Sequence, residues 1–560
     1  MASLISLRSL VPSLSLFFLF FNLSFPEDGR SLYLKYCADC HHEDRIGRTA
    51  PPLLPEFLRG KSEDYLFRVI RDGIPASTMP PFGFLHEKEV KALIDFIRKP
   101  ASEVVYGLAQ IRESYRRAPG RGKDLELRNR KNLTVVVDKG SGSVWLMEDL
   151  RVLDRFVFPN VHGGVKFSPD GERFYVPSRD GRVAVYSLKE GKLLAQVRAC
   201  VYLRNIAVSR DGKTVVASCV LPPGLVLLNR DLKPFRRIPL EGRPSAVYEL
   251  HRRDAFVLAF RDKPLFGLLE GERISYREVE EPLEDFFIDP FERFLIGSSR
   301  RAGKLLVYRI DTGQKVYEEE MGALPHLFSA AFWYSDGSFY FATRHVNSPQ
   351  VSVWRMYDWK LVRTLKVGGR GFFVRTHPAL PHLWIDNGEG DFVLLDKKTL
   401  RVSRAPVAEE GKATHVEFSA DGRYAYVSLV GERSALVVYD PLNFKVLKTL
   451  EAVHPAGKYN FLMKSRRFYP YLLGREIFMA KCWGCHHQTR TAFGPSLRWI
   501  ALHRTRDVII SQILNPEQTA ESMGYTRSVM PRIEMTPYEI EGVLAFIEGL
   551  RDDELARLDR

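Results

Sequence analysis

The sequence lacks a long membrane-spanning run, a basic block and the composition of a disordered chain. Its N-terminal apolar run covers roughly 14 residues and ends near Phe25, which is short for a membrane-spanning helix and typical of a secretory signal peptide. Lysine and arginine are scattered, so the formal net charge of +14 does not indicate a nucleic-acid partner. The remaining composition is that of a soluble globular protein.

Export and several domains follow from these observations. Residues 1–26 are expected to be a cleaved signal peptide, and because no clear small-residue cleavage site follows, an uncleaved N-terminal anchor is the alternative. In both cases the remainder is exported, which predicts a periplasmic location. A chain of 560 residues exceeds one hydrophobic core, so two to four domains are expected. Its basic surface suits an acidic partner or peripheral contact with anionic lipid.

Cysteine is scarce, and four of the six cysteines lie in two copies of one motif. The copies read GRSLYLKYCADCHHEDRIGRTAPPL and GREIFMAKCWGCHHQTRTAFGPSL. Cys-x-x-Cys-His is the attachment signature of c-type haem, because two thiols at this spacing reach both vinyl groups of one porphyrin and the histidine then meets the iron. Zinc and dithiol sites also use Cys-x-x-Cys, but neither needs the histidine. The motifs predict two covalently bound haem c groups, on Cys37, Cys40 and His41, and on Cys482, Cys485 and His486.

A methionine ahead of a final helix is expected to supply the sixth iron ligand in each copy. Met79 and Met530 both precede proline, and an amphipathic helix is predicted after each from apolar spacing at Val90, Leu93, Ile94 and Ile97, and at Ile540, Val543, Leu544 and Ile547. Met523 and Met535 are the alternatives near Met530. His42 and His487 are expected to be surface residues.

The remaining cysteines, Cys200 and Cys219, lie at the ends of β-like runs. An exported protein can join such a pair in a disulfide, and two buried free thiols are the alternative. No function is inferred from either state.

The middle of the chain predicts a β-propeller. Short β-rich runs are broken by Asp-Gly turns in SPDGERFYVPS, SRDGKTVVASC, YSDGSFYFATR and SADGRYAYVSL. Asp170 and Asp211 are about 41 residues apart, and the later turns fall at multiples of this period, which is typical of a four-stranded blade. The segment has room for about eight blades. The predicted fold is therefore multidomain, with all-α cytochrome c domains at 27–100 and 463–552, a linker at 101–131 and an all-β eight-bladed propeller at 132–462.

With these motifs in place, the middle segment resembles the haem d1 domain of the cytochrome cd1 family. The phrases that carry the resemblance are HGGVKFSPDGE, RNIAVSRDG, EDFFIDP, PHL, HVEFSADGRYAYVS and GKYN, and the likeness covers about 430 residues, ending at Asn460. It implies haem d1 or dihydro-haem d1 bound without covalent linkage. It also implies His162 as the iron ligand, Arg179 and Arg204 as partners of the ring carboxylates, and three catalytic candidates, His326, His377 and His415.

Three activities remain open on this resemblance. The phrases are most similar to the dihydro-haem d1 dehydrogenases, in which a propionate side chain is oxidised to acrylate and His326 or His415 accepts the proton. The nitrite reductase branch, which implies a homodimer, instead makes nitric oxide, with His326 and His377 donating protons. The third alternative is a non-catalytic electron-transfer or d1-carrier cytochrome.

The expected partners follow from these activities. They are small c-type cytochromes or other one-electron carriers, together with d1 maturation proteins or nitrite reductase. The C-terminal module departs from the usual family form and resembles the small soluble c cytochromes of the d1 pathway, fused to the propeller.

Overall fold

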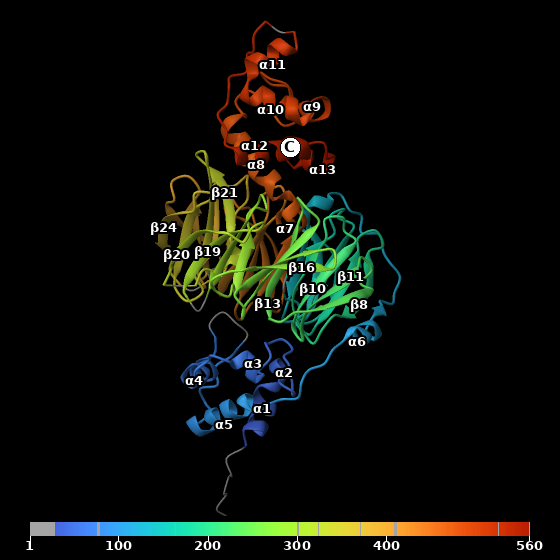
Figure 1. The fold of residues 1–560 in the computed structure, drawn as a ribbon, viewed down its shortest axis with the longest axis vertical. Helices are drawn as coiled ribbons and strands as arrows, with labels where there is room; N and C mark the ends of the chain where they lie inside the picture. Colours follow the sequence, from blue (N-terminus) through green and yellow to red (C-terminus); the bar gives the residue numbers. More distant parts are fainter. Residues whose placement is uncertain are drawn as a thin grey trace, which may run out of the picture.

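The computed structural model describes residues 28–74, 79–162, 164–299, 302–322, 324–369, 371–407, 411–524 and 526–558. The predicted signal peptide at 1–26 lies outside this part of the chain. Figure 1 shows a propeller between two helical modules, with the N-terminal module at one end and the C-terminal module at the other. Within the described ranges, no helix is long and apolar enough to cross a membrane.

The N-terminal module is built around two crossed helices. Asp28 caps the first by accepting the Ser31 amide, and the predicted apolar stripe of the last is buried. The helices cross at Gly29, where a Cβ atom would lie 2.1 Å from the Ala92 carbonyl oxygen, so only glycine permits this approach. The helices are α1 (Gly29–Tyr36), α2 (Ala38–His41), α3 (Pro55–Leu58), α4 (Glu63–Asp72) and α5 (Glu87–Arg98).

The expected linker is folded onto the propeller. It contains α6 (Leu108–Glu113) and β1 (Arg116–Arg117), and β1 pairs antiparallel with β8 (Lys192–Arg198) as a fifth strand. Ile111 is fully buried against this sheet, and the Tyr106 hydroxyl donates to the Arg198 carbonyl oxygen at 3.2 Å. These contacts fasten the N-terminal module to the propeller edge.

The middle of the chain forms eight antiparallel sheets, which confirms the predicted eight-bladed propeller. The first four blades contain β33 (Pro455–Asn460), β2 (Leu133–Asp138), β3 (Ser143–Glu148) and β4 (Arg151–Val157); β5 (Lys166–Phe167), β6 (Arg173–Pro177), β7 (Arg182–Ser187) and β8; β9 (Tyr202–Val208), β10 (Thr214–Leu221), β11 (Pro223–Asn229) and β12 (Pro234–Pro239); and β13 (Pro244–Leu250), β14 (Ala255–Phe260), β15 (Leu265–Glu270) and β16 (Arg273–Glu278). The last four contain β17 (Asp285–Ile288), β18 (Phe294–Ser299), β19 (Lys304–Arg309) and β20 (Lys315–Glu320); β21 (Ala331–Ser335), β22 (Ser338–Arg344), β23 (Gln350–Arg355) and β24 (Lys360–Lys366); β25 (Val374–Arg375), β26 (His382–Asp386), β27 (Asp391–Asp396) and β28 (Val402–Pro406); and β29 (Lys412–Phe418), β30 (Ala425–Val430), β31 (Ala435–Tyr439) and β32 (Val446–Glu451).

The ring is closed by the last strand of the propeller. β33 pairs with β2, so Thr134 lies opposite Asn460 and the two ends of the domain share one blade. The first strand of each blade lies innermost, since β9, β13 and β17 contact one another in turn, as do β25, β29 and β33. The Asp-Gly turns follow these strands. At the second of them, the Ser209 hydroxyl donates to Asp211 at 2.7 Å, and Gly212 has a φ of +70°.

The C-terminal module repeats the crossed-helix plan of the N-terminal one. Its central helices cross at Gly474, where a Cβ atom would lie 1.9 Å from the Gly542 carbonyl oxygen. The helices are α7 (Phe461–Lys464), α8 (Tyr469–Lys481), α9 (Leu497–His503), α10 (Arg506–Leu514), α11 (Pro516–Ser522), α12 (Pro537–Gly549) and α13 (Asp553–Arg557). Three 3₁₀ turns complete the chain, η1 (Arg130–Asn132), η2 (Leu327–Ser329) and η3 (Arg466–Phe468).

The C-terminal module shares one hydrophobic core with the propeller. Tyr538 stacks on Tyr357 with the ring centroids 3.8 Å apart. Glu476 is buried, accepts the Tyr334 amide at 3.0 Å and forms an ion pair with Lys397. The module is therefore seated on the propeller by packing as well as by chain connection.

Candidate functional site

The first Cys-x-x-Cys-His motif lies at the junction of α1 and α2. His41 is buried, and its Nδ1–H donates to the Pro51 carbonyl oxygen at 2.7 Å, which leaves Nε2 free to bind a metal. Burial lowers the pKa of His41, so the ring stays neutral as a ligand must. Cys37 and Cys40 are free thiols, and burial raises the pKa of Cys37 to about 12.

The second motif has the same arrangement around its histidine. The His486 Nδ1–H donates to the Pro495 carbonyl oxygen at 2.7 Å. A Cβ atom at Gly494 would lie 2.5 Å from the His486 ring, so glycine lets the loop backbone hold the imidazole. Cys482 and Cys485 are free thiols. In both modules the thiols, the oriented imidazole and the close loop fit a covalently attached haem.

Both predicted methionine ligands lie on loops ahead of a long helix of their module, α5 for Met79 and α12 for Met530. Met79 is half-buried and its carbonyl oxygen accepts the Ile74 amide at 3.2 Å, although residues 75–78 lie outside the described part. Met530 packs against the C-terminal core, as does Met535, and its amide donates to the Ser528 hydroxyl at 3.1 Å. The axial role of either methionine stays a prediction.

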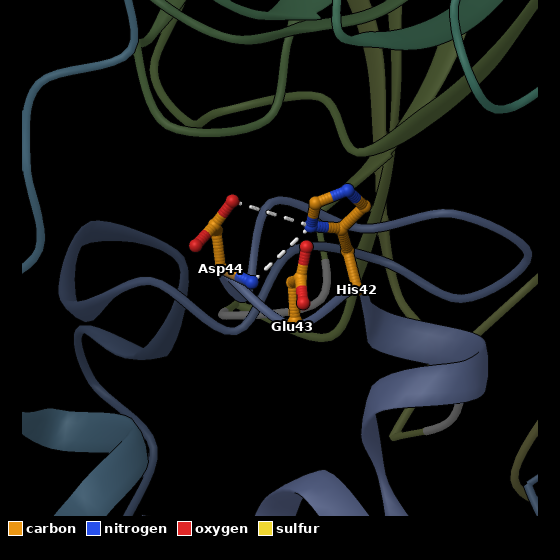
Figure 2. Close-up of side chains that lie close together, drawn as sticks. All are labelled: His42, Glu43 and Asp44. Atoms are coloured by element: carbon orange, nitrogen blue, oxygen red, sulfur yellow. Dashed lines mark hydrogen bonds and ion pairs between the residues drawn. The ribbon is translucent and has the colours of Figure 1, made fainter.

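The histidine after the first motif belongs to a small polar group. Figure 2 shows His42, Glu43 and Asp44 on the loop that follows α2, and their ligand atoms lie within 4.8 Å of one another. The His42 Nδ1 accepts the Asp44 amide at 3.2 Å, so the loop itself holds the ring. The carboxylates are exposed, and we assign this group no ligand role.

Five predicted residues converge at the end of the propeller that faces the N-terminal module, and with Phe373 they form what we call the propeller site. His162 lies between β4 and β5, and its Nε2 is 3.1 Å from Arg179. Its side chain is accessible to solvent, yet desolvation and the charges of Arg179, Lys139 and Arg204 lower its pKa well below the usual value. The imidazole is therefore neutral near pH 7, which is the form that binds iron.

Two arginines beside His162 are held by aromatic rings. The Arg179 guanidinium lies over Tyr202 at 5.4 Å, and that of Arg204 lies over Phe328 at 4.5 Å. Among the described residues, neither forms an ion pair with a carboxylate, and burial together with Arg179 lowers the pKa of Arg204 to about 9. Such uncompensated cations favour an anionic ligand, which fits a macrocycle that carries carboxylates.

His326 is oriented by a buried carboxylate. Its Nδ1–H donates to Asp285 at 2.7 Å, and the other oxygen of Asp285 accepts the Phe328 amide at 2.8 Å. This contact fixes the orientation of the ring and leaves Nε2 as the nitrogen that does not contact Asp285. The ring stands edge-on to Phe373, with centroids 6.4 Å apart.

His415 also packs against the ring of Phe373. The ring centroids of Phe373 and His415 are 4.2 Å apart. The pairing of β29 with β30 shifts register between Thr414 and Glu417, and His415 has a φ of +48° in the left-handed region. Its Nδ1 is buried without a hydrogen-bond partner in the structure, and burial lowers its pKa well below the usual value. A bulge, strained backbone and an unsatisfied nitrogen together mark a functional position.

The expectation that His377 belongs to this group is wrong. His377 follows β25 instead of preceding it, so the strand carries it to the end of the propeller under the C-terminal module. There it lines a small cavity with Leu462 and Tyr471. Its Nε2–H donates to the Ala420 carbonyl oxygen at 3.0 Å and its Nδ1 accepts the Ala379 amide at 3.0 Å, so both ring nitrogens are satisfied.

Three residues of the site were missed at the sequence level: Asp285, Phe373 and Tyr459. Asp285 precedes His326 by 41 residues, which is one blade period, and that spacing is the signal that would have found it. Tyr459 packs against the hydrophobic cluster that includes Val161, the neighbour of His162 in the chain, and burial raises its pKa to about 12, so its hydroxyl stays protonated. Tyr459 is the tyrosine of the GKYN phrase that supports the family resemblance, and this phrase is the sequence signal that could have identified it.

Comparison with known proteins gives these groups a context. Residues 128–464 match the family described as "Cytochrome D1 heme domain", residues 25–97 match "Cytochrome C oxidase, cbb3-type, subunit III" and residues 471–551 match "Cytochrome c". The chain is 37% identical to the "Dihydro-heme d1 dehydrogenase" of Pseudomonas aeruginosa over 77% of its own length and 93% of that protein. It is also 39% identical to "Cytochrome c55X" of the same species, over 12% of this chain and 56% of that protein.

A solved structure described as "Dihydro-heme d1 dehydrogenase NirN in complex with DHE" is 35% identical. It aligns with 77% of this chain and 98% of its own length at a TM-score of 0.65. The family match covers the whole propeller, and separate cytochrome c matches cover the N-terminal and C-terminal modules. The chain therefore belongs to the cytochrome d1 haem-domain family, in a form that carries a cytochrome c module at each end.

Proposed function

We propose that the chain oxidises dihydro-haem d1 to haem d1, converting one propionate side chain of the macrocycle into an acrylate. The observation that carries this proposal is the contact of both His326 and His415 with the ring of Phe373, next to His162 and two arginines that form no ion pair with a carboxylate among the described residues. The likeness to the Pseudomonas aeruginosa dehydrogenase, over nearly the whole of that protein, supports the same substrate.

The residues of the propeller site take distinct roles in this proposal. His162 is neutral and reaches solvent, so it is the proximal ligand of the substrate iron. Arg179 and Arg204 hold ring carboxylates, since a guanidinium fork matches a carboxylate in planar geometry. His326, whose tautomer Asp285 fixes, directs Nε2 at the opposite face of the macrocycle.

The reaction needs a base close to the propionate. Two C–H bonds break, one C=C bond forms, and two protons and two electrons leave the side chain. His415 is neutral because its pKa lies well below the usual value, and its buried Nδ1 has no hydrogen-bond partner among the described residues, so the ring can take a proton transiently and pass it on. The protonated hydroxyl of Tyr459 can donate to the substrate carboxylate.

The c-type haems, when bound, each accept one electron from the reaction. The N-terminal module packs on the propeller at the substrate end, where Leu54 and Tyr202 belong to one hydrophobic cluster, so it is placed to receive electrons first. Small c-type cytochromes or other one-electron carriers then accept them from the modules. The product passes to d1 maturation proteins or to nitrite reductase.

We infer a periplasmic location. Its supports are the N-terminal signal-peptide pattern, the c-type haem motifs and the disulfide between Cys200 and Cys219, whose Cα atoms lie 6.0 Å apart. Peripheral contact with a membrane surface and a homodimer stay proposals that rest on the basic surface and on the family alone.

Nitrite reduction is the weaker candidate. That chemistry was expected to use His326 and His377 together, and His377 lies at the other end of the propeller with both ring nitrogens bonded. No other described residue takes its place as a second proton donor in our assignment. A non-catalytic carrier would not need the strained, unpartnered His415.

The test is to mix the purified protein, with both c haems attached, with dihydro-haem d1 and a one-electron acceptor under anaerobic conditions. Mass spectrometry of the extracted macrocycle should show the loss of two hydrogens. The variant His326→Ala should lose this conversion, and the matched variant His377→Gln should keep it. Nitric oxide formed from nitrite by protein with tightly held haem d1 would overturn the proposal, as would an unchanged macrocycle.

A further inference from the structure

The proposed oxidation releases protons inside the protein, and these protons must reach solvent. The inference here rests on that proposed function. Two protons leave the propionate, whereas haem c and other one-electron carriers take only electrons. The substrate and the N-terminal module cover the end of the propeller where His162 lies. The protons therefore need a path through protein groups, and the propeller axis offers one.

A buried carboxylate lies on the same strand as His415. Glu417 belongs to β29 and its side chain is only 2% exposed. One of its oxygens lies 2.5 Å from the Lys464 ammonium, and the same oxygen is 3.9 Å from Arg375. The other charged or titratable groups that face Glu417 are Lys458 and Tyr459 from β33 and Tyr469 from α8. Glu417 is the carboxylate at the centre of this mostly cationic group.

Lys464 connects Glu417 to a small cavity beyond it. The cavity has a volume of about 10 Å³ and is lined by Lys464, Ser465, Lys166, Glu249 and His251, together with apolar side chains. This is close to the smallest space that holds one water molecule, and its polar lining supplies the partners such a water needs. Glu249 lies 3.2 Å from Lys166, and the backbone amide of His251 donates to Glu292 at 2.8 Å.

We propose that Glu417 and Lys464 relay protons from His415 through this cavity to Glu249 and His251, from which they leave at the end of the propeller that the C-terminal module covers. The oxidation balances with this relay: of the four electrons in the two broken C–H bonds, two form the new C=C bond, and two leave one at a time to the c haems or to an external one-electron acceptor. Both protons leave separately as hydrated protons.

The groups of the relay differ in how firmly they hold a proton. Burial next to Arg375 lowers the pKa of Lys464 to about 8, so its ammonium can release and regain a proton near neutral pH. Burial lowers the pKa of His251 to about 4, so it passes a proton on without retaining it. The Lys166 ammonium helps hold the pKa of Glu249 below its ordinary value, which keeps that carboxylate ionised and able to take a proton only transiently.

The test follows protons and electrons in the same single-turnover experiment. The protein with both c haems is mixed anaerobically with dihydro-haem d1, while a pH-indicator dye reports proton release and the c-haem absorbance reports reduction. In the variant Glu417→Gln, proton release should slow by at least about tenfold, while affinity for dihydro-haem d1, measured by visible titration, stays unchanged. Glu417→Asp should restore most of the rate, which a purely structural role would not predict.

Further variants keep the inference open to refutation. His251→Gln changes the far end of the relay and should also delay proton release. Glu148→Gln, which changes an equally buried glutamate away from the axis, should not. Proton release at the wild-type rate in both Glu417→Gln and His251→Gln would overturn the relay. If the wild-type protein leaves dihydro-haem d1 unchanged, the proposed function fails, and the relay fails with it.

Discussion

The ion pair between Glu476 and Lys397 fastens the C-terminal module to the propeller, and its removal should loosen that module. Glu476 lies on α8, Lys397 follows β27, and both side chains are less than 10% exposed, at 8% and 7%. Glu476 also accepts the Tyr334 amide, and Lys397 also donates to the His377 carbonyl oxygen at 2.9 Å. The variant Glu476→Gln keeps the side-chain volume and an acceptor for the Tyr334 amide, but it leaves the buried Lys397 ammonium without its anionic partner.

Breaking a buried pair from one side costs about 3–5 kcal/mol, because the remaining charge stays in a poorly solvated place. We expect Glu476→Gln to lower the opening free energy of α8 by an amount in this range. The double variant with Lys397→Met removes the stranded charge and should recover most of the loss. Hydrogen exchange of α8 amides, followed by mass spectrometry, measures the opening free energy of α8 in the single and the double variant of the full-length protein.

The matched control is the exposed pair of Glu87 and Lys91 on α5, which lie 2.9 Å apart. Glu87→Gln should leave the exchange of its helix unchanged, because water screens this pair. The reasoning would be refuted if Glu476→Gln cost less than about 1 kcal/mol, the usual upper value for a surface pair. The reasoning would also be refuted if the double variant lost as much opening free energy as the two single variants together.

Three other predictions follow from particular contacts. Burial lowers the pKa of His377 to about 3, so unfolding takes up a proton at this residue below its ordinary pKa of about 6.5. The stability of the protein should therefore fall as the pH drops from about 6.5 towards 3. The thermal midpoint of the variant His377→Gln should depend less on pH in this window. Reduction of the disulfide between Cys200 and Cys219, which are 19 residues apart, should lower the free energy of unfolding by about 3 kcal/mol in urea titrations. Gly474→Ala places a methyl group 1.9 Å from a backbone oxygen of α12, so the C-terminal module should melt at a lower temperature in calorimetry, whereas Gly484→Ala, which meets nothing within 4 Å, should not change it.

The fold was predictable from sequence because its local signals repeat. Asp170 and Asp211 accept hydrogen bonds from the serines two positions before them, and the glycines after them have positive φ, so each turn carries its own chemistry. The closure of the ring by β33, the strand β1 in the linker and the shared core of the C-terminal module were not predictable in this way. They depend on contacts between segments far apart in the chain, which no local pattern encodes.

Most residues of the candidate site could be predicted from the sequence, because they lie in motifs that recur near the starts of the blades. The structure brings five of these residues together, because His162, Arg204, His326 and His415 lie on an innermost strand or in the loop before it. Arg179 follows β6, which is antiparallel to the innermost strand β5 and so ends where β5 begins. The sequence pattern around His377 did not reveal that this residue follows its strand, which reverses the end of the propeller at which it lies.

The partners of the site histidines escaped notice because they lie one blade away. Asp285 reaches His326 across one blade period, and Phe373 touches both His326 and His415 from a third blade. A search at the blade spacing from each histidine would have found Asp285. The contact with Phe373 depends on side-chain packing at the centre of the ring, which sequence spacing does not determine.

The most direct measurement is an experimental structure of the protein in complex with dihydro-haem d1. Our account predicts the iron on the His162 Nε2, ring carboxylates on Arg179 and Arg204, and the propionate within hydrogen-bonding reach of His415. A macrocycle held by another residue, or bound at the end of the propeller where His377 lies, would contradict it.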